Sequence, residues 1–384
     1  MLKAQSAYKG IVSVGTKFHA PYTADALFQY NMLNKFIAGK RFENRTKIPD
    51  AMIMNISLPH YIGALLRKLP LIGHKLPYNI ISDKLFDVFA KNKMCDVDFF
   101  IGFNNYSLDQ MKKSKNKATL FLEQRIAHVQ TEQEIYIKEF GKLPSNLSSL
   151  IIKRKLMEYE LADYILVPSQ FVFDSMVSNG IPEEKLILIP YGYDPGVFYK
   201  KEEKTTTNEG LKVVFVGQVG FRKGIRYLLE AVHNLQRKGR DIQLTLAGNI
   251  DNNVMTLLES YKDSFIHKKF VPQKELVDIY NESDLFILPS LCEGSALVTY
   301  EAAACGLPLI VTHNTGTVVT NNHDGIIVES GSTKSIEEAL EKLYFDRGLL
   351  KDMKFNISNT IKEYTWDKYA EKLVTAIVQR LKNL

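Results

Sequence analysis

Cysteine is scarce in this sequence of 384 residues, and its three copies, Cys95, Cys292 and Cys305, form no Cys-x-x-Cys pair. An odd number of widely spaced thiols argues against a disulfide framework and against a cysteine zinc site. No apolar run reaches the roughly 18 residues that a transmembrane helix needs. The first residues also lack the apolar core and the cleavage site of a signal peptide. We therefore expect a cytoplasmic protein with reduced thiols.

Familiar cofactor and metal motifs are missing as well. The sequence has neither a G-x-G-x-x-G dinucleotide fingerprint nor a Walker A loop, which argues against the usual dinucleotide enzymes and P-loop proteins. An Asp-x-Asp at residues 96–98 precedes the apolar stretch 99–103 instead of following a strand. We interpret this motif as the start of a strand. We predict no metal and no cofactor.

Acidic residues are few near the N-terminus. Residues 1–120 contain 18 Lys and Arg against 8 Asp and Glu, a formal charge of +10, whereas residues 196–384 are neutral overall. Such a charge favours an anionic partner, either a membrane surface or a phosphorylated acceptor. The alternative is a solvated basic face without a partner. Nucleic acid is not expected, because no nucleic-acid-binding module and no basic helix with interleaved aromatic residues is present.

Apolar runs separated by glycine loops dominate the first half. A strand at 11–14, a loop at 15–21 and a helix at 22–37 predict the opening of a Rossmann-like domain. The segment 61–93 has two interpretations: two helices that pack on the core, or an amphipathic surface that lies on a membrane. Further strands are expected at 51–57, 99–103 and 118–122, with a helix at 150–161.

The second half repeats the pattern. We expect strands at 211–216, 242–247, 267–271, 285–288 and 309–312, with helices at 225–237 and 275–283. The polar stretch 200–210 reads as a linker. The predicted organisation is therefore an N-terminal domain at 1–198, a linker at 199–210, a C-terminal domain at 211–365 and a terminal helix at 366–384.

The stretch 284–312 contains a strand, a turn of small residues and a helix. At such a junction the backbone N–H groups and the helix dipole favour an anion, and Gly294, Ser295 and Ala296 would let a ligand approach the backbone. Glu293 lies on the turn, and Glu301 lies eight positions further, on the helix. Carboxylates in this setting are suited to accept hydrogen bonds from sugar hydroxyls.

Glu293-x7-Glu301, within the sequence PSLCEGSALVTYEAAACGLPLIVT, resembles the signature of retaining glycosyltransferases of the GT-B fold, family 4. The resemblance implies an α/β fold with two Rossmann-like domains facing a cleft and a C-terminal helix crossing back to the N-terminal domain. It also implies metal-independent transfer of a sugar, with retention of configuration, from a nucleoside-diphosphate sugar to a glycan, lipid-linked or small-molecule acceptor. Polysaccharide biosynthesis is the setting that it suggests. The basic first half of the chain adds the expectation of a peripheral location at the inner face of the membrane.

The same resemblance assigns residues to the donor. The loop 217–224 is similar to the family's G-R-x(4)-K-G loop; Lys223 matches, Gln218 replaces the usual Arg, and Arg222 adds a cation. Arg222, Lys223 or both would hold the donor diphosphate, and Glu293 would hold the sugar. Glu301 would bind the ribose. The remaining donor contacts would come from Gly217, Val271, Gly294, Ser295, Ala296 and Leu297.

Residues 123–128 resemble the family's E-R-G-x-x-H segment, with Gln124-Arg125 in place of Arg-Gly. His128 would position the sugar or relay a proton, so the expected catalytic residues are Glu293, His128 and Lys223. Gly15 and His19 would face the acceptor. The alternatives are a catalytically silent nucleotide-binding scaffold, a GT-B sugar-nucleotide epimerase or phosphorylase, and a two-lobed sugar-binding protein.

Overall fold

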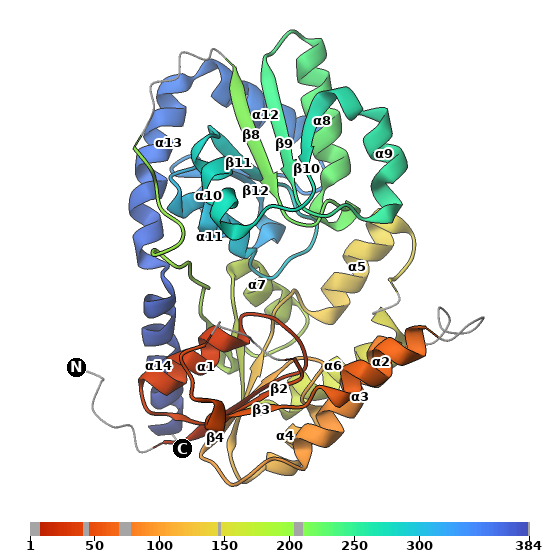
Figure 1. The fold of residues 1–384 in the computed structure, drawn as a ribbon, viewed down its shortest axis with the longest axis vertical. Helices are drawn as coiled ribbons and strands as arrows, with labels where there is room; N and C mark the ends of the chain where they lie inside the picture. Colours follow the sequence, from red (N-terminus) through yellow and green to blue (C-terminus); the bar gives the residue numbers. More distant parts are fainter. Residues whose placement is uncertain (1–7, 41–45, 69–77, 145–146, 203–209, 383–384) are drawn as a thin grey trace. The chain divides into compact units, whose positions relative to one another are not determined.

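The computed structural model describes residues 8–40, 46–68, 78–144, 147–202 and 210–382. The chain forms two compact units, the first made of Met1–Ile189 with Asp367–Leu384 and the second of Pro190–Trp366. Each is a parallel β-sheet covered by helices (Figure 1). Most of the predicted linker lies outside the described residues, which omit 203–209.

The first unit contains a seven-stranded parallel sheet with the order β3-β2-β1-β4-β5-β6-β7. Its central strands are buried along their whole length, as the continuous apolar runs require. The strands are β1 Gly10–Val14, β2 Leu33–Ala38, β3 Ile53–Asn55, β4 Phe99–Phe103, β5 Thr119–Glu123, β6 Tyr164–Val167 and β7 Leu186–Leu188. The helices are α1 Ala20–Gln29, α2 Leu58–Arg67, α3 Tyr78–Lys91, α4 Leu108–Ser114, α5 Val129–Phe140, α6 Ser149–Leu161, α7 Gln170–Ser178 and α14 Trp366–Lys382.

The predicted helix at 22–37 is wrong. The chain forms the shorter helix α1, turns at Asn31, whose φ of 55° lies in the left-handed region, and continues as β2. Asn is one of the few residues that adopt this conformation readily. The buried residues Leu33, Phe36 and Ile37 are spaced as they would be in a helix, so their pattern alone did not reveal the strand.

The segment 61–93 forms two helices that pack on the unit. Helices α2 and α3 contact each other closely at Gly63, where an added Cβ would lie 3.1 Å from the Cβ of Ser82. Phe86 and Ala90 of α3 are fully buried. The two predicted helices are therefore confirmed for the described part of this segment, with α3 packed on the core and Leu58, Tyr61 and Leu65 of α2 exposed.

The terminal helix α14 belongs to the first unit from Asp367 onward. The Tyr369 hydroxyl lies 2.9 Å from the Thr23 hydroxyl on α1, and the Arg380 guanidinium lies over the Tyr164 ring on β6. This helix therefore returns to the N-terminal sheet, as the fold class implies.

The second unit contains a six-stranded parallel sheet with the order β10-β9-β8-β11-β12-β13. Four strands have the predicted bounds, whereas β10 begins two residues earlier than expected. The strands are β8 Leu211–Val216, β9 Ile242–Ala247, β10 Phe265–Lys268, β11 Leu285–Leu288, β12 Leu309–Thr312 and β13 Gly325–Val328. The helices are α8 Ile225–Arg237, α9 Met255–Ser260, α10 Gln273–Asn281, α11 Leu297–Ala304, α12 Thr333–Phe345 and α13 Arg347–Thr360.

Both sheets have a point at which the strand order reverses. It lies between β1 and β4 in the first unit and between β8 and β11 in the second. In open parallel sheets, ligands bind beyond the carboxyl ends of the strands at such a point. The loops after β1, β4, β8 and β11 are therefore where a site is expected in each unit.

Candidate active site

The loops after β8 and β11 are joined closely in the second unit. Gly224 has a φ of 73°, and an added Cβ there would lie 2.0 Å from the carbonyl oxygen of Pro289. The Leu291 N–H donates a hydrogen bond of 2.9 Å to the Arg222 carbonyl. Only glycine permits this combination of backbone angle and close approach. The contact brings the cations of one loop beside the carboxylate of the other.

Glu293 is the centre of this cluster. Its Oε1 forms an ion pair with Arg222 and lies 2.7 Å from the Lys223 Nζ, and the Arg222 guanidinium also donates to the Cys292 carbonyl at 2.8 Å. Burial raises the pKa of Glu293, but the charges of Lys223 and Arg222 outweigh it and lower the pKa overall. Burial lowers the pKa of Lys223. With Glu293 ionised, two cations face one carboxylate, which leaves a positive charge for an anionic ligand.

The loop after β9 supports the loop after β8. Gly248 has a φ of 143°, and an added Cβ there would lie 2.0 Å from the Gly217 carbonyl oxygen, while the Gly217 N–H donates to the Ala247 carbonyl at 2.9 Å. The Gln218 side chain donates to Asp251 at 2.6 Å. Gln218 therefore links the loop after β8 to the loop after β9. The cations beside Glu293 are Arg222 and Lys223.

Helix α11 begins directly after the Glu293 turn. Its first residue is Leu297, and no described side chain caps the helix at Ala296. The Glu293 and Ala296 N–H groups donate to the carbonyls of Asn314 and Thr315. These two N–H groups therefore stabilise the turn and are not available to donate hydrogen bonds to an anion. The Ser295 hydroxyl lies 2.8 Å from the Tyr300 hydroxyl. The first turn of α11 is thus held in place, with its dipole directed at the turn.

Glu301 lies on the second turn of α11. The Tyr280 hydroxyl donates to its Oε2 at 3.3 Å, and burial raises the pKa of Glu301 to about 7. Val271 is half-buried and lies between β10 and α10. A hydroxyl group of a ligand would add a second donor to the Glu301 carboxylate, beside the Tyr280 hydroxyl. Such a contact would favour the ionised form of Glu301.

In the first unit, the loop after β1 meets the end of β5 through His19 and Glu123. The His19 Nε2 lies 2.8 Å from Glu123 Oε1, and both side chains are buried. Gly15 has no room for a side chain, because an added Cβ would lie 2.1 Å from the Tyr106 ring. Gly15 and His19 thus lie at the carboxyl end of β1, as the sequence predicts.

His128 caps the N-terminus of α5. Its Nδ1 accepts a hydrogen bond of 3.3 Å from the Gln130 N–H, so the neutral ring carries its proton on Nε2. Burial, together with the charge of Lys155, lowers the pKa of His128 to about 4. His128 is therefore neutral at pH 7 and is a hydrogen-bond donor through Nε2.

The substituted pair Gln124-Arg125 has two separate roles. The buried Gln124 amide donates to the carbonyls of Ile126 and Ala127, at 2.7 and 3.1 Å, and so it shapes the loop that leads to His128. The Arg125 guanidinium stacks on Phe18, with its central carbon 3.4 Å from the ring centroid. Sequence reasoning did not assign Arg125 a role.

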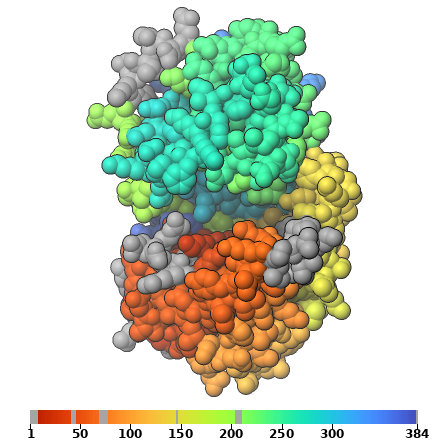
Figure 2. Space-filling model, turned by 45° about the vertical axis from the view of Figure 1, so that its right-hand side comes forward, coloured from red at the N-terminus to blue at the C-terminus, as the bar shows by residue number. Residues whose placement is uncertain are grey.

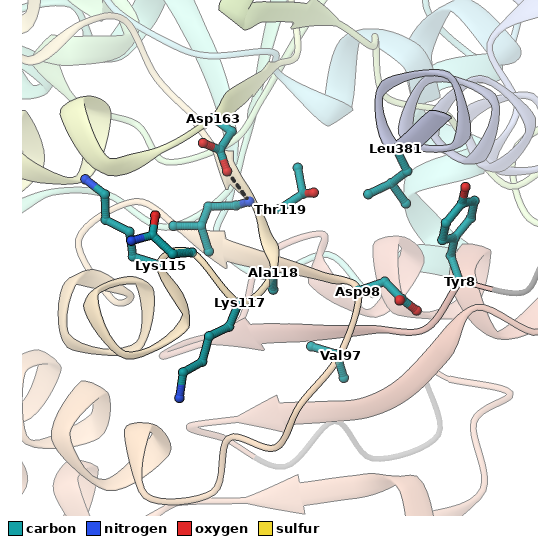
Figure 3. Close-up of a pocket in the computed structure, with 11 residues that line it drawn as sticks. Tyr8, Val97, Asp98, Lys115, Lys117, Ala118, Thr119, Asp163 and Leu381 are labelled. Atoms are coloured by element: carbon teal, nitrogen blue, oxygen red, sulfur yellow. Dashed lines mark hydrogen bonds between the residues drawn. The ribbon is translucent and has the colours of Figure 1, made fainter. Parts of the chain in front are cut away.

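The Asp-x-Asp motif lies at the opposite end of the sheet. Asp98 accepts a hydrogen bond of 2.7 Å from the Lys9 N–H at the start of β4. Asp163 accepts one of 2.8 Å from the Leu120 N–H, drawn as a dashed line in Figure 3. Both carboxylates line a surface hollow of about 450 Å³ at the amino ends of the strands. They serve the backbone there, and this hollow is not the candidate site.

Two kinds of feature are absent from the described residues. Within them, no three His, Cys, Asp or Glu residues come together as a metal site would require. Within the same ranges, none of the helices combines the length and the apolar character that crossing a membrane requires.

Among known proteins, the chain is similar to glycosyltransferases. Residues 198–360, which lie within the second unit, match the model of the family described as Glycosyl transferases group 1. The chain is 27% identical over 222 residues to the capsular polysaccharide biosynthesis glycosyltransferase CapM of Staphylococcus aureus, covering 54% of this chain and 58% of CapM. It is 26% identical over 214 residues to D-inositol 3-phosphate glycosyltransferase of Paenarthrobacter aurescens, covering 51% and 52%. The chain thus spans little more than half of these two relatives.

Solved structures match over nearly the whole chain. Sucrose-phosphate synthase from Thermosynechococcus elongatus has a TM-score of 0.70 at 16% identity, covering 98% of this chain and 100% of that one. HepE from Anabaena, in complex with UDP-glucose, has a TM-score of 0.66 at 12% identity, covering 97% and 100%. These likenesses confirm the predicted GT-B fold.

Proposed function

We propose that the protein is a metal-independent glycosyltransferase that moves a sugar, with retention of configuration, from a nucleoside-diphosphate sugar to a glycan, lipid-linked or small-molecule acceptor. The observation that carries this proposal is the cluster of Arg222, Lys223 and Glu293 at the carboxyl edge of the second sheet. It combines a positive charge for a diphosphate with a carboxylate for hydroxyl groups. CapM and HepE, to which the chain is similar, are respectively named as a glycosyltransferase and solved with UDP-glucose.

The chemistry makes specific demands on this cluster. The bond between the anomeric carbon and the diphosphate oxygen breaks, and its electron pair leaves with the diphosphate. The acceptor oxygen forms the new bond to the same carbon, and its proton passes to the leaving diphosphate. Arg222 and Lys223 would stabilise the growing negative charge, together with the α11 dipole at Gly294 to Leu297. Gly217 would let the phosphates approach the backbone.

Glu293 would accept hydrogen bonds from sugar hydroxyls, and Glu301 from the ribose. The backbone at Val271 would contact the base. His128 would donate from Nε2 to the sugar, since a pKa of about 4 leaves it without a second proton to transfer at pH 7. Gly15 and His19 would border the acceptor.

Contact with a membrane surface is a further part of the proposal. Leu58, Tyr61 and Leu65 lie on one face of α2 and are 57%, 72% and 66% exposed. Figure 2 shows residues of the orange segment that contains α2 on the surface of the first unit. Apolar side chains on a basic domain suit an anionic bilayer. Sedimentation with phosphatidylglycerol vesicles should carry down the protein, and Tyr61→Ser with Leu65→Ser should abolish this.

The proposed activity is tested by transfer itself. Purified protein is given UDP-, GDP- or ADP-linked sugars together with a lipid and polysaccharide extract, with and without EDTA. We expect nucleotide release with one donor, unaffected by EDTA, and a product whose anomeric configuration by NMR matches that of the donor. An inverted product would contradict retention. Donor binding without any turnover would instead favour the scaffold.

A further inference from the structure

Arg125 lies where three loops of the first unit meet. It follows β5, and its guanidinium stacks on Phe18, which follows β1, with the Tyr106 ring, which follows β4, 6.0 Å away. The loops after β1 and β4 border the point at which the strand order reverses, and β5 is the next strand beyond β4. Through its contact with Phe18, the Arg125 side chain reaches the loop after β1. The guanidinium therefore occupies the position where an open parallel sheet binds a ligand.

The guanidinium makes no polar contact within the described part of the chain. No hydrogen bond or ion pair joins Arg125 to another described residue, and its Nε is buried without an acceptor. Arg154, on the neighbouring helix α6, differs, because it pairs with Asp87 and donates to the Asn105 carbonyl at 3.0 Å. A buried donor without an acceptor is unfavourable, so an oxygen-bearing ligand would be stabilised there.

The positive charge of Arg125 is only partly offset by its surroundings. Asp83 is an acid that interacts electrostatically with Arg125, and it already accepts a hydrogen bond of 3.0 Å from the Asn105 amide. Burial raises the pKa of Asp83 to about 7, against the lowering effect of the charges of Arg154 and Arg125. Two further cations, Lys17 and Lys40, lie exposed after β1 and β2. The positive charge at this edge of the sheet is therefore only partly offset.

The aromatic support of Arg125 is held rigidly. Asn105 has a φ of 79° and is fixed by Glu158, whose carboxylate accepts from the Asn105 N–H, from the Asn104 amide at 2.9 Å and from the Ser107 N–H at 2.9 Å. Since Asn105 and Ser107 flank Tyr106 in the sequence, this buried network fixes the position of Tyr106. A guanidinium held flat on aromatic rings loses little conformational freedom when it binds a ligand.

We infer that Arg125 binds a phosphate group of the acceptor, so that the acceptor is a phosphorylated sugar or a lipid with a phosphate headgroup. This inference rests on the proposed function for the role of acceptor, but the binding itself requires no turnover. The planar guanidinium can hold a phosphate through two parallel hydrogen bonds, with Lys17 and Lys40 adding charge. Glycine stands at this position in the family segment that residues 123–128 resemble, so the contact would be particular to this chain.

The test measures binding to the full chain without nucleotide. Calorimetry compares glucose 6-phosphate, glucose and glucuronate with wild-type protein, with Arg125→Gln and with Arg237→Gln, which removes the same charge from an exposed position in α8. We expect glucose 6-phosphate to bind at least tenfold more tightly than either other sugar. Arg125→Gln should lose at least tenfold, and Arg237→Gln should bind as the wild type does. Equal binding of glucose, or tighter binding of glucuronate, overturns the phosphate assignment.

Lys223→Met identifies the site, because it removes a cation of the proposed donor cluster. Binding that is lost in Lys223→Met but kept in Arg125→Gln overturns the inference.

A second experiment uses phosphatidylcholine vesicles with or without phosphatidic acid. Binding that requires phosphatidic acid and Arg125 indicates a lipid source of the phosphate. If wild-type protein binds neither glucose 6-phosphate nor vesicles with phosphatidic acid, the inference is overturned, even if the protein hydrolyses a nucleotide-sugar. If Arg125→Gln does not unfold as the wild type does, Arg125→Lys serves in its place and should show an intermediate affinity.

Discussion

The Lys223 Nζ lies 2.7 Å from Glu293 Oε1, and the two side chains are 11% and 15% exposed. They come from loops that are 70 residues apart in the sequence. Their contact depends on Gly224, whose backbone lies against Pro289. The ion pair therefore reports whether the two loops at the carboxyl edge of the second sheet are correctly joined.

Glu293→Gln should destabilise the ligand-free protein by about 3–5 kcal/mol, because it leaves Lys223, which is 11% exposed, without its counter-charge. Glu338→Gln is the matched control, since it breaks a pair in which Lys334 and Glu338 are 86% and 67% exposed. It should cost less than about 1 kcal/mol. Urea unfolding measures both values. Similar losses in the two variants would show that the cluster does not act as a buried pair.

Gly224→Ala should lower the free energy of unfolding by about 3 kcal/mol or more. It combines a left-handed backbone, which disfavours alanine by about 1–2 kcal/mol, with a clash against the Pro289 carbonyl. Gly239→Ala separates the two effects, since Gly239 has a φ of 78° with no atom near its Cβ position. It should cost only about 1–2 kcal/mol. The same urea titration applies, and equal values would exclude the close approach as the cause.

Nucleotide-sugar binding should strengthen as the pH rises through 7. The pKa of Glu301 is raised to about 7, and hydroxyl groups of a ribose would favour the ionised carboxylate, so binding lowers that pKa and releases a proton. Calorimetry in buffers of different ionisation enthalpy should detect this release near pH 7. Glu301→Gln should bind about tenfold more weakly at pH 8, by the loss of one charge-assisted hydrogen bond. An unchanged pH dependence in the variant would remove Glu301 from the binding site.

His128→Asn and His128→Ala should separate two roles of this residue. Asparagine is a good N-cap and alanine is a poor one, so only the alanine variant should lose about 1 kcal/mol of stability. Both variants should lose activity, because neither keeps the Nε2–H donor. An asparagine variant with full activity would show that His128 only caps α5.

The same residue makes a prediction about pH and stability. The pKa of His128 is lowered to about 4 in the folded protein, against about 6.5 for an unperturbed histidine. The unfolded chain therefore binds more protons between pH 6.5 and pH 4. The free energy of unfolding should fall as the pH falls through this window, and His128→Asn should remove this contribution. Urea unfolding at several pH values compares the two proteins.

The sheet of the second unit could be predicted well, because buried parallel strands are short apolar runs bounded by glycine and polar residues. Strands β8, β9, β11 and β12 begin and end where the sequence indicates. The failure at 22–37 has a physical cause, since Leu33, Phe36 and Ile37 satisfy the helical spacing as well as the buried face of a strand. The Tyr30-Asn31 turn was the signal that could have separated the two.

The site was predictable as a set of loops but not as a set of contacts. The resemblance indicates Lys223 and Glu293, but their ion pair depends on a backbone approach at Gly224 that no residue pattern encodes. Gln218 was noted as a departure, and only the structure gives its partner, Asp251. Arg125 was noted as a departure too, while its stacking on Phe18 needs the loops after β1 and β5 to meet.

The most direct measurement is a panel of UDP-, GDP- and ADP-linked sugars, tested for thermal stabilisation and slow donor hydrolysis with wild-type protein, Lys223→Ala and Glu293→Ala. Lys262→Ala, which removes an exposed lysine, is the control. We predict that one donor stabilises and is hydrolysed by the wild-type and control proteins, and that both effects are lost in Lys223→Ala and Glu293→Ala. No stabilisation by any donor, or equal stabilisation of all four proteins, would contradict the assignment of this cluster as the donor site.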